Sequence, residues 1–336
     1  MLTIRPIHPD DASAFIALHK RCDLMAARAL IDESAQAFAG DGAMPQRFVF
    51  VLVDTAGDEL LGAATLAGST GIDLPRHSYR GGVVVHASAE LKLFNRVDTL
   101  LLCNDHTGHA ELTLPLMASA DSAQAPQRLL IDAMLLFVAQ QRDRFASTLV
   151  AALPGVSFEG GGSPFWSALG RHFHAGALPR DDAFFPSPER SHIARLMPKH
   201  PLYSSFLGAD AQACIGQRAL TARTAADALQ AQGLRHRGHV DVFDAGPIVE
   251  VDIVDLHAVQ ASRVLPVRVA SSGDSGGARS CLVAGVGASQ LGASLVQATL
   301  ADGALLLAEA DAQALGVAPG QRVRVLLQGD GAMTNR

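Results

Sequence analysis

The first two thirds of the chain alternate between short apolar runs and segments with helical spacing of apolar residues. The runs 47–55 (RFVFVLVDT) and 59–68 (ELLGAATLAG) are typical of strands, and the AGD between them indicates a hairpin-like turn. Residues 2–5 predict a short strand before them. Two helical patterns lie between, one in 8–22 (HPDDASAFIALHKRC), which Asp10 or Asp11 could cap, and one from Leu24 to Phe38.

Further strand patterns follow a loop, and each is rich in Val, Leu or Ala. They are 81–88 (GGVVVHAS), 97–108 (VDTLLLCNDHTG), 111–117 (ELTLPLM) and 147–154 (STLVAALP). A helix is predicted from Gln127 to about Phe145, and the Gly-rich stretch 157–162 opens a short helix capped by Ser163. This order predicts an α/β domain with a mixed sheet.

Past residue 190 the pattern becomes mostly helical before strands return at 239–256. We expect a first domain over 1–260 with this helical extension, a small β-rich domain over 261–328, and a disordered tail at 329–336. The segment 271–277 (SSGDSGG) is typical of a linker. It contains a GxSxG match around Ser275, but no buried strand leads into it and no hydrolase-ordered His and Asp follow it, so we reject a nucleophile there.

Composition narrows the function classes. The 336 residues carry a mild net charge of −6 with scattered Lys and Arg, which argues against nucleic-acid binding. The four cysteines form no CxxC pair, as expected for reduced thiols. No signal peptide or membrane span is apparent, so the sequence predicts a soluble, cytoplasmic protein.

The order of elements resembles the GNAT acyltransferase fold. That resemblance implies that the strands 111–117 and 147–154 splay apart, that the pantetheine arm of an acyl-CoA lies between them, and that its pyrophosphate sits on the loop 118–126. The residues expected to contact this cosubstrate are Leu114, Pro115, Leu116, Met117 and Gln127.

Longer blocks resemble one family within that fold, the arginine N-succinyltransferases, including their arginine/ornithine-acting paired subunits. The blocks are 84–112 (VVHASAELKLFNRVDTLLLCNDHTGHAEL), 163–174 (SPFWSALGRHFH), 194–203 (ARLMPKHPLY), 215–217 (IGQ) and 240–247 (VDVFDAGP). The resemblance implies transfer of a succinyl group from succinyl-CoA to the α-amino group of arginine or ornithine in arginine catabolism. It implies no permanently bound cofactor, and an oligomer of like or paralogous subunits.

Three departures from the family pattern affect the expected chemistry. The basic RxxGxG loop is replaced by ASADSAQAPQR (118–128), which has no glycine, and Pro126 removes one backbone donor. The family's VHP, whose histidine is the expected proton donor, is replaced by Arg218 and Ala219. The TSLP loop between the first two helices is replaced by CDLMAARAL (22–30).

These departures leave alternatives open. Other residues could carry out a related acyl transfer, or the chain could be a catalytically degenerate structural or regulatory subunit that pairs with an active paralogue. A ligand-binding sensor is a third possibility.

The stretch NDHTGHAEL (104–112) supplies the candidate catalytic residues His106 and Glu111, and Asp105 as a substrate contact. The other candidate substrate contacts are Glu159, His86 and Asp244. His106 and His109 could be read as an HxxH metal pair, but no third ligand accompanies them at a useful spacing, so we expect no metal site.

Overall fold

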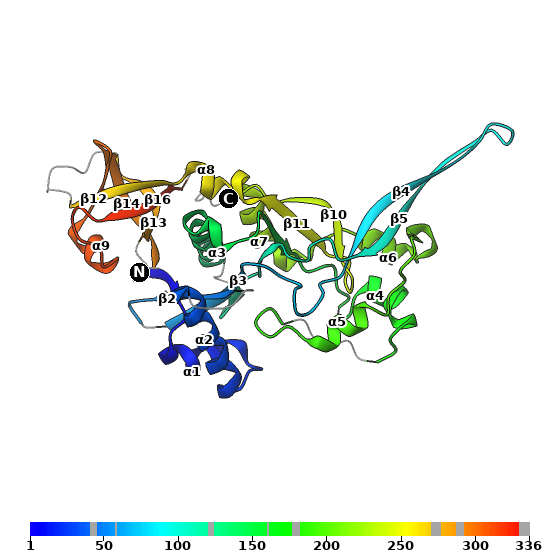
Figure 1. The fold of residues 1–336 in the computed structure, drawn as a ribbon, viewed down its shortest axis with the longest axis horizontal. Coiled ribbons are helices and arrows are strands. Elements are labelled where there is room, and N and C mark those ends of the chain that lie inside the picture. The colour runs from blue at the N-terminus through cyan, green and yellow to red at the C-terminus, as the bar shows by residue number, and fades with distance from the viewer. Residues whose placement is uncertain are drawn as a thin grey trace.

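A computed structural model describes residues 1–40, 46–57, 59–119, 124–159, 161–176, 182–269, 277–286 and 292–328. The molecule is elongated, with a β-rich body at one end and a long hairpin at the other (Figure 1). A central sheet runs between them. Its strands, in spatial order, are β1 (Leu2–Pro6), β2 (Arg47–Asp54), β3 (Glu59–Ala67), β6 (Ala110–Leu112), β8 (Thr148–Ala152), β11 (Pro247–Asp252), β10 (Arg235–Asp241), β4 (Ser78–Ser88), β5 (Leu93–Cys103) and β9 (Leu202–Tyr203).

Helices cover both faces of the part of the sheet that contains β1, β2, β3, β6 and β8. On β2, Phe48, Phe50 and Leu52 pack in one core with α3 (Gln124–Gln140), while the alternating Val49, Val51 and Val53 pack with α1 (Ala12–His19) and α2 (Leu24–Ala39). The helices α7 (Arg223–Ala231) and α8 (His257–Ala261) join α3 on its face. Both faces of β2 are therefore buried, which explains its unbroken apolar run.

The helix ends follow local sequence chemistry. The Asp23 side chain accepts a hydrogen bond from the Ala26 N–H at 2.8 Å, and Gly40 ends α2 with a φ of 85°. The helix α3 begins three residues earlier than the predicted Gln127, because Pro126 is tolerated in the first turn, where its missing N–H would have no intrahelical partner. It ends at Gln140 rather than near Phe145.

The predicted strand 111–117 is interrupted, and this interruption opens a wedge in the sheet. β6 pairs in parallel with β8 through Ala110↔Leu149 and Glu111↔Val150. The chain then bulges, shifts its register against β3 by one residue, and resumes as β7 (Leu116–Met117), which pairs with β3 and not with β8. Within the described residues the two strands therefore separate after Glu111, as the resemblance implied.

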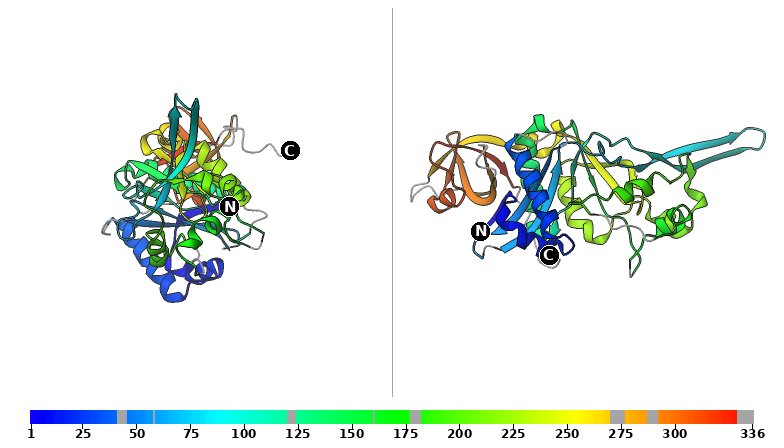
Figure 2. Two further views of the ribbon diagram at one scale, coloured as in Figure 1. Left: turned by 90° about the vertical axis from the view of Figure 1, so that its right-hand side faces the viewer. Right: turned by 60° about the horizontal axis from the view of Figure 1, so that its bottom comes forward.

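A second core packs beneath the base of the long hairpin. It joins α4 (Pro164–Ala168), α5 (Pro188–Ala194) and α6 (Ala209–Cys214) to β4, β5 and β10. Tyr79 is fully buried there, with its ring 5.9 Å from that of Phe165. Figure 2 shows the rest of the β4–β5 hairpin projecting beyond this core.

The C-terminal body has its own apolar core. Its elements are β12 (Arg263–Val269), β13 (Arg279–Gly285), β14 (Ala293–Ala301), β15 (Ala304–Leu307), α9 (Glu309–Ala314) and β16 (Arg322–Leu327). The strand pairings close into a ring in the order β13, β16, β12, β15, β14 and back to β13. β14 also pairs with β1, which continues the central sheet into this body.

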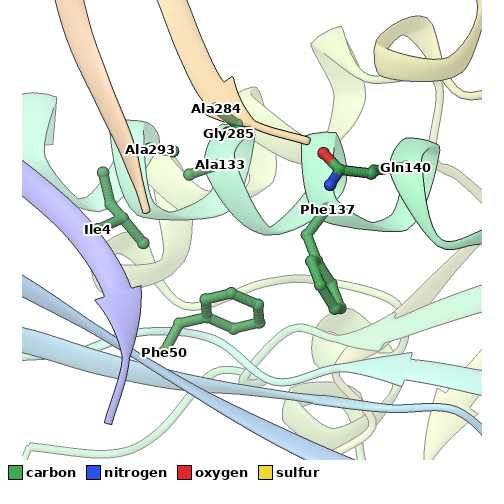
Figure 3. Close-up of a pocket in the computed structure, with 8 residues that line it drawn as sticks. All are labelled: Ile4, Phe50, Ala133, Phe137, Gln140, Ala284, Gly285 and Ala293. Carbon is green, nitrogen blue, oxygen red and sulfur yellow. The ribbon is translucent and has the colours of Figure 1, made fainter. Parts of the chain in front are cut away.

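A small apolar cavity lies at the seam between the two bodies. Ile4, Phe50, Phe137 and Ala293 are among its lining residues (Figure 3). Its volume of about 10 Å³ has room for little more than one water molecule. We therefore interpret it as a packing defect rather than a ligand site. The expected domain limit near residue 260 stays a prediction, the tail 329–336 lies outside the described residues, and so does nearly all of the predicted linker 271–277.

Candidate active site

The wedge presents backbone groups that the sheet leaves unused. The Ala118 N–H donates to the Leu61 carbonyl at 2.9 Å. Because neighbouring residues of a strand direct their backbone groups to opposite sides, the Met117 N–H and C=O point away from β3 and into the wedge. Among the described residues, the Leu114 N–H donates to no protein acceptor. Pro115 has no N–H, so Leu114 and Met117 are the donors available along this edge.

A row of three side chains, two of them carboxylates, runs across the sheet beside the wedge. We call this row the polar strip. Glu111, Val150 and Glu250 are aligned in register on β6, β8 and β11, so their side chains share one face. Their strand neighbours Leu149 and Val249 pack in the core with α3. The strip therefore lies on the face opposite α3.

Glu111 occupies the last paired position before the strands separate. It is 9% exposed and forms an ion pair with Arg76, whose side chain is a quarter exposed. Glu111 is thus the carboxylate of the strip that lies nearest, in strand register, to the opening of the wedge.

His106 is buried, at 1% exposure, and its Nε2 lies 3.0 Å from Glu250 Oε2. Burial holds the pKa of His106 below its ordinary value even though the Glu250 carboxylate opposes that shift, so the ring is neutral at pH 7. A carboxylate only accepts hydrogen bonds, so the proton of this neutral ring resides on Nε2. The lone pair is left on Nδ1, which has no partner among the described residues.

Asp105 and His239 form a second acid–histidine pair beside His106 and Glu250. We call these four residues the cluster. Asp105 Oδ2 lies 3.2 Å from His239 Nε2 and 3.1 Å from Arg80 Nη1. Burial alone would raise the pKa of Asp105, but the contacts with His239 and Arg80 hold it below its usual value. The rings of His106 and His239 meet edge to face, with centroids 4.4 Å apart. Two acid–histidine pairs therefore pack against each other.

The structure separates the remaining predicted contacts from this cluster. His86 lies on the long hairpin, with its ring 5.9 Å from that of Tyr203. Glu159 is exposed in its loop. The two carboxylate oxygens of Asp244 each accept a backbone N–H at 2.8 Å, from Gly155 and Gly246. Asp244 thereby ties the end of β8 to the β10–β11 turn.

The cluster also contains side chains of the kinds that bind metal ions. Ligand atoms of His106, His239 and Glu250 lie within 4.8 Å of one another, as do those of Cys103, Asp105 and His239. The carboxylates already face arginines, because Glu250 lies 3.5 Å from Arg237 in addition to the Asp105–Arg80 pair. The absence of a metal site stays a prediction.

An open groove of about 810 Å³ lies against β7, the strand that borders the wedge. Leu116, Met117 and Ala118 form one wall, and the end of α1 with Lys20 and Arg21 forms another. The connection from α1 to α2 spans only residues 20–23, in the region where the family's TSLP loop is expected. Arg21 Nη2 lies 3.8 Å from Asp182 Oδ2. The side chains of Lys20 and Arg21 are both exposed. The groove ends at the first residue of the expected pyrophosphate loop, of which residues 120–123 lie outside the described part.

The position expected to hold the family's proton donor also lies beside the wedge. The Ala219 N–H donates to the Pro154 carbonyl at 2.8 Å, just past the end of β8, and Arg218 forms an isolated bridge with Gly155. Ala219 therefore lies just past the end of β8, one of the two strands that bound the wedge.

Sequence reasoning missed Glu250, His239 and Arg76, which pair with or pack against predicted site residues. Glu250 sits in a strand pattern, IVEVDIV, whose apolar neighbours are buried against α3. A carboxylate in the middle of such a run was the signal that could have identified it, because a buried carboxylate needs a partner.

Comparison with known proteins agrees with this geometry. A family model described as the arginine N-succinyltransferase beta subunit matches residues 2–258. Arginine N-succinyltransferases from Shigella boydii and Citrobacter koseri are 33% and 34% identical, over 97% of this chain and 97% of each relative. The structure of arginine/ornithine succinyltransferase subunit AI from Pseudomonas aeruginosa superposes with a TM-score of 0.83 at 28% identity, covering 98% of this chain and 99% of that one. None of the described helices is long and apolar enough to cross a membrane. The chain belongs to the arginine N-succinyltransferase family.

Proposed function

We propose that this chain transfers a succinyl group from succinyl-CoA to the α-amino group of arginine or ornithine. The observation that carries the proposal is the separation of β7 from β8 directly beside a buried polar strip. A thioester slot and an amine site are the two parts that such a transfer needs. The match of a relative over 97% of this chain supports the same reaction over a purely structural subunit.

The thioester would lie along β7. The Met117 N–H and C=O can pair with the amide groups of the pantetheine arm, as an added strand would. The Leu114 N–H lies nearer the point of separation, where it can donate to the oxyanion that forms when the amine attacks the thioester carbonyl.

The polar strip would hold the amine. An α-amino group is protonated at pH 7 and must lose a proton before it attacks. Glu111 is the acceptor we propose, because it adjoins the slot. The carboxylates of Glu250 and Asp105 lie farther across the sheet, where they can meet the cationic end of the side chain. His106 is neutral, and the hydrogen bond from its Nε2 holds the Glu250 carboxylate in place.

The leaving thiolate needs less help from a proton donor than a leaving alkoxide would. A simple thiol has a pKa of about 8.5, so a thiolate can leave near neutral pH without a general acid. We infer that Ala219 slows this step without preventing it.

Phosphate binding would be shared between two elements. The N-terminus of the long helix α3 offers free N–H groups near Gln127, and Lys20 and Arg21 line the groove that reaches Ala118. These cations can compensate for the basic loop that the sequence lacks. We expect the double variant Lys20→Ala, Arg21→Ala to raise the Kd for succinyl-CoA by about tenfold or more, measured by calorimetry. Arg28→Ala, on the exposed side of α2, is the matched control, and an unchanged Kd in the double variant would contradict this role.

Two measurements test the function itself. Calorimetry with succinyl-CoA should show binding, and absence of heat at millimolar ligand would remove the transferase proposal. Thiol release on addition of arginine, ornithine or lysine should then identify the acceptor. Binding without thiol release for any amine would favour a degenerate subunit.

A further inference from the structure

The bulge that opens the wedge lies between two regular registers of the sheet. Before it, β6 pairs Leu112 with Leu66, and after it, β7 pairs Leu116 with Ala63. Three residues between Leu112 and Leu116 therefore oppose two residues between Ala63 and Leu66. A bulge interrupts the ladder of backbone hydrogen bonds, so other contacts are needed to hold its shape.

Thr113, the first residue of the bulge, bonds to Thr65 on β3 in an unusual way. Its N–H donates to the Thr65 carbonyl at 3.0 Å, as in an ordinary antiparallel pair. In such a pair the Thr65 N–H would donate in return to the Thr113 carbonyl. Here it donates instead to the Thr113 hydroxyl oxygen, Oγ1, at 3.1 Å. The side chain of Thr113 therefore takes the place of its own backbone carbonyl in the ladder.

A hydroxyl suits this position because it both accepts and donates hydrogen bonds. The Thr113 hydroxyl accepts from the Thr65 N–H. It also lies 2.9 Å from Thr65 Oγ1 and 3.3 Å from the Thr65 carbonyl oxygen, so its own proton has an acceptor. Thr65 is only 2% exposed, so its N–H depends on this acceptor within the protein.

The substitution of a hydroxyl for a carbonyl releases one peptide unit from the sheet. Within the described part of the chain, the Thr113 carbonyl accepts no backbone N–H, and the Leu114 N–H donates to no protein acceptor. Both groups belong to the same peptide unit, which is planar, so they turn together. The orientation of the Leu114 N–H therefore depends on how the Thr113 side chain bonds to Thr65.

We propose, on the basis of the acyl transfer proposed above, that the Thr113 hydroxyl is a positioning group for catalysis. By occupying the Thr65 N–H, it keeps the Thr113 carbonyl out of the ladder. It thereby holds the Leu114 N–H in the orientation that donates to the oxyanion. The Thr113 side chain acts through the backbone rather than on the substrate.

Thr113→Val tests this role, because valine keeps the shape of threonine but has neither donor nor acceptor. The Thr113 carbonyl can then turn back to the Thr65 N–H and take the Leu114 N–H with it. In the thiol-release assay, kcat should fall by at least about tenfold, since loss of one oxyanion donor typically costs about 10²- to 10³-fold. The Kd for succinyl-CoA should stay within about twofold, because β7 keeps its own bonds to β3.

Further variants separate positioning from a purely structural role. Thr113→Ser keeps the hydroxyl and should hold kcat within about threefold of the wild-type value. Thr65→Val removes the other hydroxyl but leaves the Thr65 N–H with its acceptor, so kcat should also stay within about threefold. Thr113→Ala should repeat the loss if Thr113→Val does not fold by circular dichroism. A wild-type kcat without the Thr113 hydroxyl, or an equal loss in Thr65→Val, would overturn the proposal.

Crystal structures keep this test apart from that of the function. In the wild type the Thr65 N–H should face Thr113 Oγ1, and in Thr113→Val the peptide unit between Thr113 and Leu114 should be rotated. An unrotated peptide unit would overturn the proposal whatever the kinetics. A wild type that releases no thiol would instead remove the proposed function, while the crystal structures would still decide whether the hydroxyl holds the peptide unit.

Discussion

Glu111 combines burial, an ion pair with Arg76 and a position at the edge of the wedge. If it accepts the proton of the amine, Glu111→Gln should lower kcat by about 10²- to 10⁴-fold, because general-base catalysis typically contributes that much. The Kd for succinyl-CoA should change little. Glu309→Gln, exposed on α9 in the C-terminal body, is the control. Thiol-release kinetics and calorimetry measure the two quantities, and a kcat near the wild-type value would exclude Glu111 as the base.

Ala219 offers a gain-of-function test at the residue scale. It lies beside the end of β8 and is only partly buried, so a histidine can be accommodated. We expect Ala219→His to raise kcat by up to about tenfold by protonating the departing thiolate. The rate should then decline at high pH as the imidazolium loses its proton. Arg218→His, one residue earlier, is the matched control, and an unchanged rate and pH profile in the Ala219→His variant would contradict the assigned position.

Local sequence motifs could identify some site residues and not others. His106 and Glu111 stand in one short motif, so the sequence alone indicated them. Glu250 is 144 residues from His106, and only the order β6, β8, β11 brings the two together. Asp244 was predicted as a substrate contact from its motif. In the structure its carboxylate accepts two backbone N–H groups, and a role with substrate stays a prediction.

At the scale of elements, β7 depends on a close approach to β3. A Cβ on Gly62 would lie 3.1 Å from the Leu116 carbonyl oxygen and 2.8 Å from Met117 Sδ. Gly62→Val should therefore push β7 out of register and narrow the wedge, which raises the Kd for succinyl-CoA by about tenfold and lowers Tm by several degrees. Gly57→Val, where nothing lies within 4 Å, should leave the Kd unchanged. Equal effects of the two variants on Kd would contradict this account.

Most elements followed from apolar periodicity, and the exceptions have physical causes. The predicted α2 matches Leu24–Ala39 closely, because a capping aspartate and a glycine mark its ends. The strand 111–117 is broken by a bulge, which a short apolar run cannot reveal because both strand and bulge tolerate the same residues. The long hairpin was predicted only as two separate strands, since its pairing is set between segments and not within them.

At the scale of the whole molecule, the buried cluster should make stability depend on pH. Burial lowers the pKa of His106 below the 6.5 of an exposed ring, so the unfolded chain binds this proton more readily than the folded one. The free energy of unfolding should therefore fall as pH drops below about 6.5 and stop falling, for this group, below the folded pKa. His106→Gln should make the fall between pH 7.5 and 5.5 shallower in urea denaturation. His86→Gln, on the β4–β5 hairpin, should reproduce the wild-type slope, and an unchanged slope for the His106→Gln variant would contradict the explanation.

The pairing of β14 with β1 has a consequence for biosynthesis. Thr3 pairs with Ser294, so the edge of the first strand is not covered until residue 294 has left the ribosome. An uncovered edge is a template for association with other nascent chains. Chains that terminate before residue 290 should therefore aggregate even though every residue of the wedge has already been made.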